Sequence, residues 1–230
     1  KCSNRSSVFF YLMNNSHKLS YKNMRGLFFM DNIYIDESVK IGKDVKIFPF
    51  NVVIGNTTIG DNTILYPFNF IQDSIIGSGC EVSHSHLQNC EIEDEVKVGP
   101  FARLRPNTKI CKKCKIGNFV EVKNSILNTG VKASHLAYIG DAEVGENTNV
   151  GCGVIFANYN GKVKNKIKVG KNCFLGSNCN LIAPLSVADK TYICAGSTLT
   201  KDTNVDDFVI ARQRETIKPN RANKYLKEND

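Results

Sequence analysis

The stretch IGKDVKIFPFNVVIGNTTIGDNTILYPFNFI, residues 41–71, places an aliphatic side chain at every sixth position. These residues are Ile41, Ile47, Val53, Ile59, Leu65 and Ile71. The same step returns later in the chain, at Val169, Leu175, Leu181, Val187, Ile193, Leu199 and Val205, and it persists with slips between the two runs. An amphipathic helix has a period of roughly 3.6 residues and a single alternating strand a period of 2. Period six instead predicts short strands that turn a corner after each hexad.

A second column supports this interpretation, because a small or β-branched residue lies two positions before many of the aliphatic residues. Its members are Thr57, Thr63, Cys80, Val96, Cys114, Val120, Cys173, Cys179, Thr191, Ser197 and Thr203. Strand side chains alternate, so both columns should point inward. We therefore predict an all-β chain folded as a parallel β-helix, with three hexads per coil and about nine coils between residues 36 and 206.

The two ends of the chain lack this repeat. Residues 1–30 include LSYKNMRGLFF, which predicts a short helix, and residues 207–230 form a basic polar tail. We expect a linker or helical segment at 1–30, a β-helix domain at 31–206 and the tail at 207–230. The chain starts with Lys, so we expect a part of a longer protein. The first residues do not resemble a signal peptide, and no apolar run has the length of a membrane span.

Net charge and cysteine positions limit the partners. A charge of +8 favours an anionic partner, but the basic residues are scattered and no nucleic-acid-binding signature is present. A phosphorylated small molecule explains the positive net charge equally well.

Four of the nine cysteines fall in the inward column, which favours reduced thiols and a cytoplasmic protein. Cys111 and Cys114 form half of a zinc motif with no second half, so we predict no metal site.

The repeat is interrupted between Ala133 and Lys164. His135 falls at a corner position, and the polar segment ANYNGKVKNKIK, residues 157–168, predicts a projecting loop that carries Asn158, Tyr159 and Lys164. Arg105 and Lys123 are 18 residues apart, so they should stack on one face as a phosphate clamp. Tyr138 and Asn149 should also point outward. A solvated turn histidine and ordinary surface cations are the alternatives for these positions.

Four segments together resemble a known family: GPFARLRP (99–106), IGNFVEVK (116–123), SHLAYIGDAEVGENTNVG (134–151) and ANYNG (157–161). They are similar to the acetyltransferase half of the bifunctional bacterial glucosamine-1-phosphate acetyltransferase/N-acetylglucosamine-1-phosphate uridyltransferases, which are hexapeptide-repeat enzymes with a left-handed β-helix. The resemblance extends from about residue 31 through Arg212. It implies acetyl transfer from acetyl-CoA to the amine of glucosamine 1-phosphate, as a step towards UDP-N-acetylglucosamine for the cell wall.

The resemblance also implies roles for individual residues. His135 would be the catalytic base. The substrate would be bound by Arg105, Lys123, Tyr138, Asn149, Asn158 and Lys164, and acetyl-CoA by Cys152, Tyr159, Ser177, Ala195 and Arg212. Cys152 occupies a position where the family usually has alanine. The family implies a homotrimer with acetyl sites between neighbouring chains and no metal in this half, and the uridyltransferase half has no counterpart in this sequence.

Three other interpretations share the fold. A related hexapeptide-repeat acyltransferase could use a different acceptor, and a non-catalytic β-helix could serve trimer formation or regulation. A γ-type carbonic anhydrase would need three zinc-binding histidines, but His84, His86 and His135 do not have that spacing. In the acetyltransferase interpretation, the amine attacks the thioester while the imidazole takes its proton, and no covalent intermediate is needed. The sequence does not identify the group that stabilises the thioester oxyanion.

Overall fold

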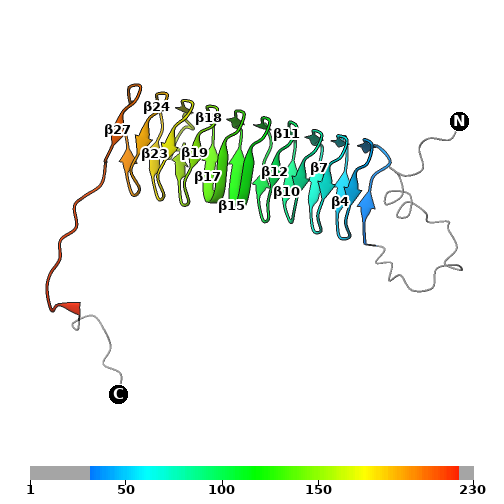
Figure 1. Cartoon of the computed structure of the whole chain (residues 1–230), viewed down its shortest axis with the longest axis horizontal. Coiled ribbons are helices and arrows are strands. Elements are labelled where there is room, and N and C mark those ends of the chain that lie inside the picture. Colours follow the sequence, from blue (N-terminus) through cyan, green and yellow to red (C-terminus); the bar gives the residue numbers. More distant parts are fainter. Residues whose placement is uncertain (1–31, 223–230) are drawn as a thin grey trace, which may run out of the picture.

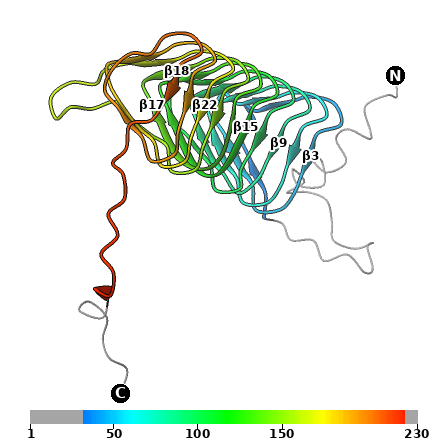
Figure 2. The same ribbon diagram turned by 60° about the vertical axis from the view of Figure 1, so that its left-hand side comes forward.

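A computed structural model describes residues 32–222 of the chain. This part is a left-handed parallel β-helix, which confirms the predicted fold class (Figures 1 and 2). The predicted helical segment within residues 1–30 lies outside the described residues. The three faces of the β-helix are formed by stacked, parallel strands, with nine strands on one face and ten strand segments on each of the other two, so the described residues form about ten coils rather than the nine expected.

The strands of the three faces alternate along the chain. The first face consists of β3 (Lys46–Ile47), β6 (Ile64–Leu65), β9 (Glu81–Val82), β12 (Lys97–Val98), the starts of β15 (Lys115–Lys123) and β17 (Lys132–Gly140), β19 (Asn149–Val150), β22 (Phe174–Leu175), β25 (Tyr192–Ile193) and β27 (Phe208–Val209). The second face consists of β1 (Tyr34–Ile35), β4 (Val52–Ile54), β7 (Phe70–Gln72), β10 (His86–Gln88), β13 (Arg103–Leu104), the ends of β15 and β17, β20 (Ile155–Ala157), β23 (Asn180–Ile182) and β26 (Thr198–Leu199). The third face consists of β2 (Lys40–Ile41), β5 (Thr58–Ile59), β8 (Ile75–Ile76), β11 (Cys90–Ile92), β14 (Thr108–Ile110), β16 (Ile126–Leu127), β18 (Ala142–Val144), β21 (Ile167–Val169) and β24 (Leu185–Val187).

The core is the interior column of aliphatic side chains that the hexad pattern predicts. Leu65, Leu104 and Leu175 are fully buried, and the hydrophobic cluster continues from Val39 to Leu199. The prediction is wrong at Val205, which is 59% exposed. Val205 lies in a turn, where the N–H of the next residue, Asp206, donates to the carbonyl of Asp189. The last strand, β27, therefore begins beyond the expected end at 206, and Val209 packs against the core instead.

The corner between the first and second faces carries residues with positive φ in successive coils. They are Phe50, Phe68, His84, Phe101, Phe119 and Leu136, which we call the aromatic corner. The phenylalanine rings of this corner stack outside the core in pairs, with centroids 4.7 Å apart for Phe50 and Phe68 and 5.6 Å apart for Phe101 and Phe119. The strained backbone is tolerated because pairing with the coils on either side fixes it. Leu136 ends this series and places its neighbour His135 directly at the corner.

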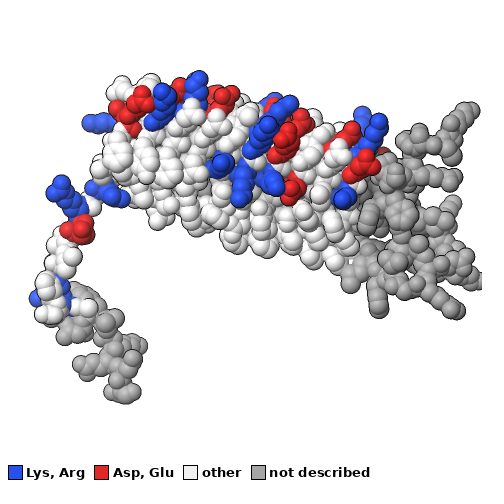
Figure 3. All heavy atoms as spheres, viewed as in Figure 1, with Lys and Arg blue, Asp and Glu red and all other residues white. Residues whose placement is uncertain are grey.

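Between Lys40 and Val209, the longest connection between consecutive strands is the loop between β20 and β21, which projects away from the coils in Figure 2. At the far end, residues 213–222 are exposed and leave the rod as an extended segment (Figure 1). Charged side chains run mainly along one long edge of the view in Figure 3, while much of the lower surface there is uncharged. Within residues 32–222, no helix could cross a membrane and the cysteines are free thiols. No group of three or more possible metal ligands occurs within the same range.

Candidate functional site

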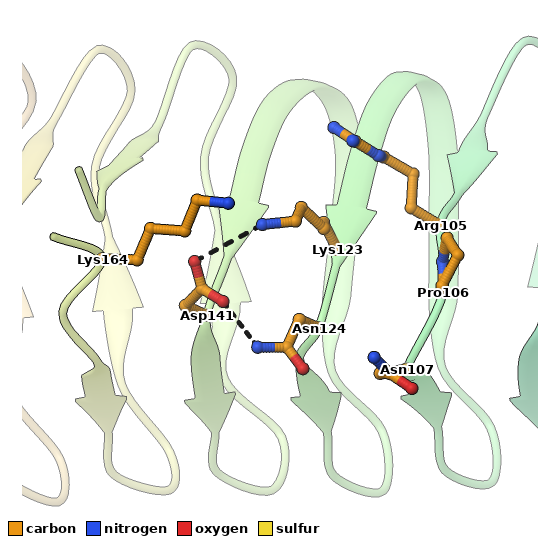
Figure 4. Close-up of a pocket in the computed structure, with 7 residues that line it drawn as sticks. All are labelled: Arg105, Pro106, Asn107, Lys123, Asn124, Asp141 and Lys164. Carbon is orange, nitrogen blue, oxygen red and sulfur yellow. Dashed lines mark hydrogen bonds and ion pairs between the residues drawn. The ribbon is translucent and has the colours of Figure 1, made fainter.

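A pocket of about 360 Å³ lies at the corner between the second and third faces (Figure 4). It is lined by Arg105, Pro106, Asn107, Lys123, Asn124, Asp141 and Lys164. Arg105 and Lys123 come from adjacent coils, because the Arg105 N–H donates to the carbonyl of Val122 at 2.9 Å. The predicted stacking of these two cations is therefore correct. Lys164 reaches the same pocket from the projecting loop, so three cationic side chains line one hollow.

Two carboxylates form ion pairs with two of the three cations of this pocket. Arg105 donates to Glu121 at 2.8 Å, and the Lys123 ammonium lies 3.7 Å from a carboxylate oxygen of Asp141. The Lys123 side chain is 19% exposed and that of Asp141 8% exposed, so the second pair is shielded from solvent. Attraction between charges is stronger in such a shielded place than in bulk water. The ion pair with Asp141 therefore restricts the Lys123 side chain to one position in the pocket.

The Asp141 carboxylate also accepts two amide hydrogen bonds. The side-chain N–H₂ of Asn124 donates to one oxygen at 2.5 Å, and that of Asn158 donates to the other. Burial raises the pKa of the Asp141 carboxyl, but these two amides and the charges of Lys123 and Lys164 outweigh burial, so its pKa lies below the usual value. Asp141 is thus an ionised carboxylate at neutral pH.

The projecting loop differs from the prediction at its first residue. Asn158 does not project: it is 6% exposed and forms the buried base of the loop on Asp141. The Asn165 N–H donates to the Asn158 carbonyl at 2.7 Å, which closes the loop. Tyr159 is exposed as expected, and its hydroxyl donates to the carbonyl of Gly161 at 2.6 Å. The base of the loop is therefore fixed while its tip faces solvent.

His135 lies at the opposite edge of the second face, exposed in β17 beside the aromatic corner. Its Nδ1 is 3.0 Å from the Asn118 Oδ1 on the preceding coil. Because a side-chain amide oxygen only accepts, this contact favours, in the neutral imidazole, the tautomer with Nδ1–H, whose Nε2 has a free lone pair. The two coils approach closely at this point, since a Cβ built on Gly117 would lie 1.9 Å from the Ser134 carbonyl oxygen. The imidazole is thus oriented by its neighbour with one nitrogen free to take a proton.

Tyr138 lies between His135 and the pocket on the same strand. It is half-buried, and a side chain at Gly140 would collide with its hydroxyl, so glycine leaves room for the phenol. From His135 to Gly140, β17 spans at most about 16 Å. Asn149 is placed elsewhere, on the first face, where it pairs with Lys132 and Phe174. The pocket itself includes neither His135, Tyr138 nor Asn149.

The predicted acetyl-CoA contacts other than Tyr159 follow one edge of the rod. The Cys152 carbonyl accepts from Asn178 N–H at 2.8 Å, and the Ser177 carbonyl accepts from Gly196 N–H at 2.8 Å. The Arg212 guanidinium donates to the Ala195 carbonyl at 2.5 Å. This edge continues the aromatic corner, because the N–H of Gly153 donates to the Leu136 carbonyl. These positions therefore lie along the same edge as His135, and the first of them, Cys152, is on the next coil.

Sequence reasoning missed three residues that orient the site: Asn118, Glu121 and Asp141. Asn118 and His135 are 17 residues apart, so a strict 18-residue stacking rule does not pair them. Glu121 and Asp141 are visible as carboxylates near the predicted cations. Their role could not be inferred without knowing which cation each one meets.

The comparisons with known proteins agree with this fold. A family model described as bacterial transferase hexapeptide (six repeats) matches residues 38–73, and one described as GMPPB C-terminal domain matches residues 86–160. The bifunctional protein GlmU of Clostridium kluyveri is 47% identical over 207 residues, covering 90% of this chain and 45% of the relative. GlmU of Caldicellulosiruptor saccharolyticus is 48% identical over 185 residues, covering 80% and 40%. The chain thus spans less than half the length of these relatives.

A solved structure provides an independent comparison of the fold. The UDP-N-acetylglucosamine acyltransferase of Arabidopsis superposes with a TM-score of 0.61 at 12% identity, covering 77% of this chain and 69% of the other. At this identity the likeness supports the β-helix alone.

Proposed function

Since the chain belongs to the GlmU family of hexapeptide-repeat transferases, we propose that it transfers the acetyl group of acetyl-CoA to the amine of glucosamine 1-phosphate. The products are N-acetylglucosamine 1-phosphate and CoA, which places the reaction before UDP-N-acetylglucosamine and the cell wall. The observation that carries the proposal is the position of Arg105, Lys123 and His135 at the two edges of one face. We assign the reaction to the β-helix domain, expected at residues 31–206 and continued by β27 to Val209, and place it in the cytoplasm.

The acceptor lies across the second face in this proposal. Its phosphate binds Arg105, Lys123 and Lys164, because cations that converge in a hollow favour a phosphate dianion. Asn158 and Tyr138 contact the sugar between the two edges. The phosphate therefore fixes the position of the amine relative to His135, and such positioning removes much of the entropic part of the barrier.

The imidazole acts as the general base. The amine attacks the thioester carbonyl carbon and His135 Nε2 takes the proton lost by nitrogen. The C–S bond then breaks, and the imidazolium returns this proton to the leaving thiolate, which releases CoA as a thiol. Asn118 keeps Nε2 free for this step by accepting from Nδ1–H. Acetyl-CoA lies along Cys152, Ser177, Ala195 and Arg212, the edge that leads to His135.

A complete site needs more than one copy of the chain. Asn149 is on the first face, and Tyr159 faces solvent on the projecting loop, so neither meets the pocket within one protomer. We propose a homotrimer in which Asn149 and the loop tip of Tyr159 complete the acetyl sites between neighbouring chains. The exposed rings of the aromatic corner, such as Phe101 and Phe119, provide apolar surface for association.

Thiol release from acetyl-CoA tests the reaction. We expect release that depends on glucosamine 1-phosphate, and much slower release with glucosamine that lacks the phosphate. His135→Ala should lower turnover by about two or more orders of magnitude, whereas His86→Ala, an exposed histidine on the same face, should not change it. Equal turnover with both acceptors would overturn the phosphate clamp, and unchanged turnover in His135→Ala would exclude this residue as the base.

A further inference from the structure

We propose that Asp141 is a positioning residue that directs the side-chain amide oxygen of Asn158 and the Lys123 ammonium towards the bound sugar phosphate. This inference rests on the proposed function, because it explains how the acceptor site acquires its shape. Asp141 lies at the corner between β17 and β18, where the second face meets the third. From there its carboxylate contacts Asn124 on an adjacent coil (Figure 4), and it also contacts Asn158 at the base of the projecting loop.

The first argument concerns the orientation of Asn158. An ionised carboxylate only accepts hydrogen bonds, so an amide that faces it must present its N–H₂ group. The N–H₂ of Asn158 donates to Asp141, and its side-chain oxygen is therefore turned the other way. Asn124 is fixed in the same manner through the other carboxylate oxygen. Asp141 thus sets two amides so that each offers an acceptor, which suits the hydroxyl and amine donors of a sugar.

The second argument concerns charge. A carboxylate in a phosphate pocket repels the ligand, and this cost needs a compensating role. Asp141 is 3.7 Å from the Lys123 ammonium, and its oxygens already accept the two amides. Because the Asp141 side chain is 8% exposed, this contact restricts Lys123 to one region beside the phosphate site. A lysine held in place loses less entropy on binding than a free one.

The third argument compares Asp141 with its counterparts in other coils. The same corner carries asparagine with positive φ at positions 89, 107 and 124 and aspartate at position 73, so both residue types adopt this backbone conformation. Asp141 also has a positive φ of 51°, and the next coil departs into the projecting loop. The corner geometry therefore accepts asparagine as well as aspartate, and the contacts with Asn158 and Lys123 distinguish Asp141 from the aspartate at position 73.

This comparison supplies the test variant. Asp141→Asn keeps the shape and should fold, but its single acceptor oxygen cannot serve both Asn124 and Asn158 in their present orientation. One of these amides must turn, and the ionic contact with Lys123 is lost. The matched control is Asp73→Asn at the same corner, where Asp73 also has positive φ and accepts from the Asn56 N–H and the Gln72 amide, far from the pocket.

Two measurements on the full chain decide the inference. In Asp141→Asn, we expect the KM for glucosamine 1-phosphate to rise at least about tenfold, with the KM for acetyl-CoA unchanged. Hydrogen exchange should quicken at the Asn165 amide, which donates to the Asn158 carbonyl and reports on the loop base. Asp73→Asn should change neither quantity. An unchanged KM, with or without faster exchange, would overturn the inference, because a merely structural role predicts that result.

The wild-type protein separates this inference from the proposed function. If the wild type does not acetylate glucosamine 1-phosphate, the proposed function fails and the substrate-directed role of Asp141 fails with it. If the wild type is active and Asp141→Asn keeps the same KM, the inference about Asp141 fails alone.

Discussion

The Nδ1 of His135 and the Oδ1 of Asn118 lie 3.0 Å apart on neighbouring coils, which links the proposed base to a residue outside the polar interruption. The hydrogen bond selects the tautomer in which Nε2 is unprotonated. Asn118→Ala removes this selection but leaves the substrate contacts in place. We expect kcat to fall by about 10- to 100-fold with both KM values nearly unchanged in steady-state assays. A fall in affinity at constant kcat would contradict the orienting role.

The cationic pocket predicts a loss that depends on the phosphate of the acceptor. Lys123→Ala should raise the KM for glucosamine 1-phosphate by about 10- to 100-fold, since a charge-assisted contact is lost. Glucosamine without phosphate should be acetylated equally slowly by the variant and the wild type. Lys115→Ala, an exposed lysine in the same strand, is the control. If both acceptors lost the same factor, Lys123 would serve the fold or the sugar rather than the phosphate.

The hexad period predicts a parallel β-helix, because an interior column that repeats every six residues can be buried in few other ways, whereas the left hand of the helix was predicted from the family resemblance. It failed at Val205, where a turn stacks on the preceding coil and the aliphatic residue points to solvent. It also did not predict that Asn51 and Asn69 occupy the interior of the first coils. The two amides can be buried there because they bond to each other and to backbone groups of their own and adjacent coils, and these partners are not visible in the sequence.

The site was only partly predictable for a related reason. Stacking of Arg105 on Lys123 follows from an unbroken 18-residue spacing, and the structure agrees. Asn158 was expected on a projecting loop, yet it is buried against Asp141, since the loop begins one residue later than its composition indicates. Where a coil departs from the 18-residue length, contacts between neighbouring coils cannot be predicted from the spacing alone. The contact of Asn118 with His135, 17 residues apart, could be identified only from the observed strand register.

The low pKa of the Asp141 carboxyl gives a prediction for acid conditions. Its folded pKa lies below the ordinary value of about 3.9, so the ionised form stabilises the loop base above that pH. This contribution is lost as the pH falls through the lower folded value. Protection of the Asn165 amide, corrected for intrinsic exchange, should stay constant from pH 8 to 5 and fall below about pH 4. Loss of protection near neutral pH would mean that another group controls the loop.

Thiol accessibility can be predicted for individual cysteines. Burial raises the pKa of Cys80 and Cys90 to about 11 and that of Cys114 to about 12, and all three are inside the rod. Only the thiolate is alkylated readily, so native protein at pH 8 should react rapidly at exposed Cys152 and hardly at these three. Mass spectrometry of iodoacetamide-labelled peptides measures this order, with urea-unfolded protein as the control.

The same labelling reports on the proposed cosubstrate. Acetyl-CoA bound along the edge of Cys152 and Ser177 should slow alkylation of the exposed Cys152. Equal labelling with and without saturating acetyl-CoA would place the cosubstrate elsewhere.

Asn69 gives a prediction for stability that is independent of the proposed reaction. Its amide is 2% exposed, donates to the Asn51 Oδ1 at 2.8 Å and the Tyr66 carbonyl at 2.6 Å, and accepts from the Ser85 N–H at 2.9 Å. Asn69→Val would leave the Ser85 N–H buried without an acceptor. We expect the free energy of unfolding to fall by about 2–3 kcal/mol, measured by chemical denaturation.

The control for this substitution is Asn56→Val in a neighbouring turn. Asn56 is exposed, so this change should alter the free energy of unfolding by less than about 0.5 kcal/mol. The difference between the two variants isolates the buried hydrogen bonds, because each replaces the same amide by the same apolar group. If Asn69→Val were as stable as Asn56→Val, the coils would have adjusted to satisfy the Ser85 N–H. The interior asparagines would then not be required for stacking of the first coils.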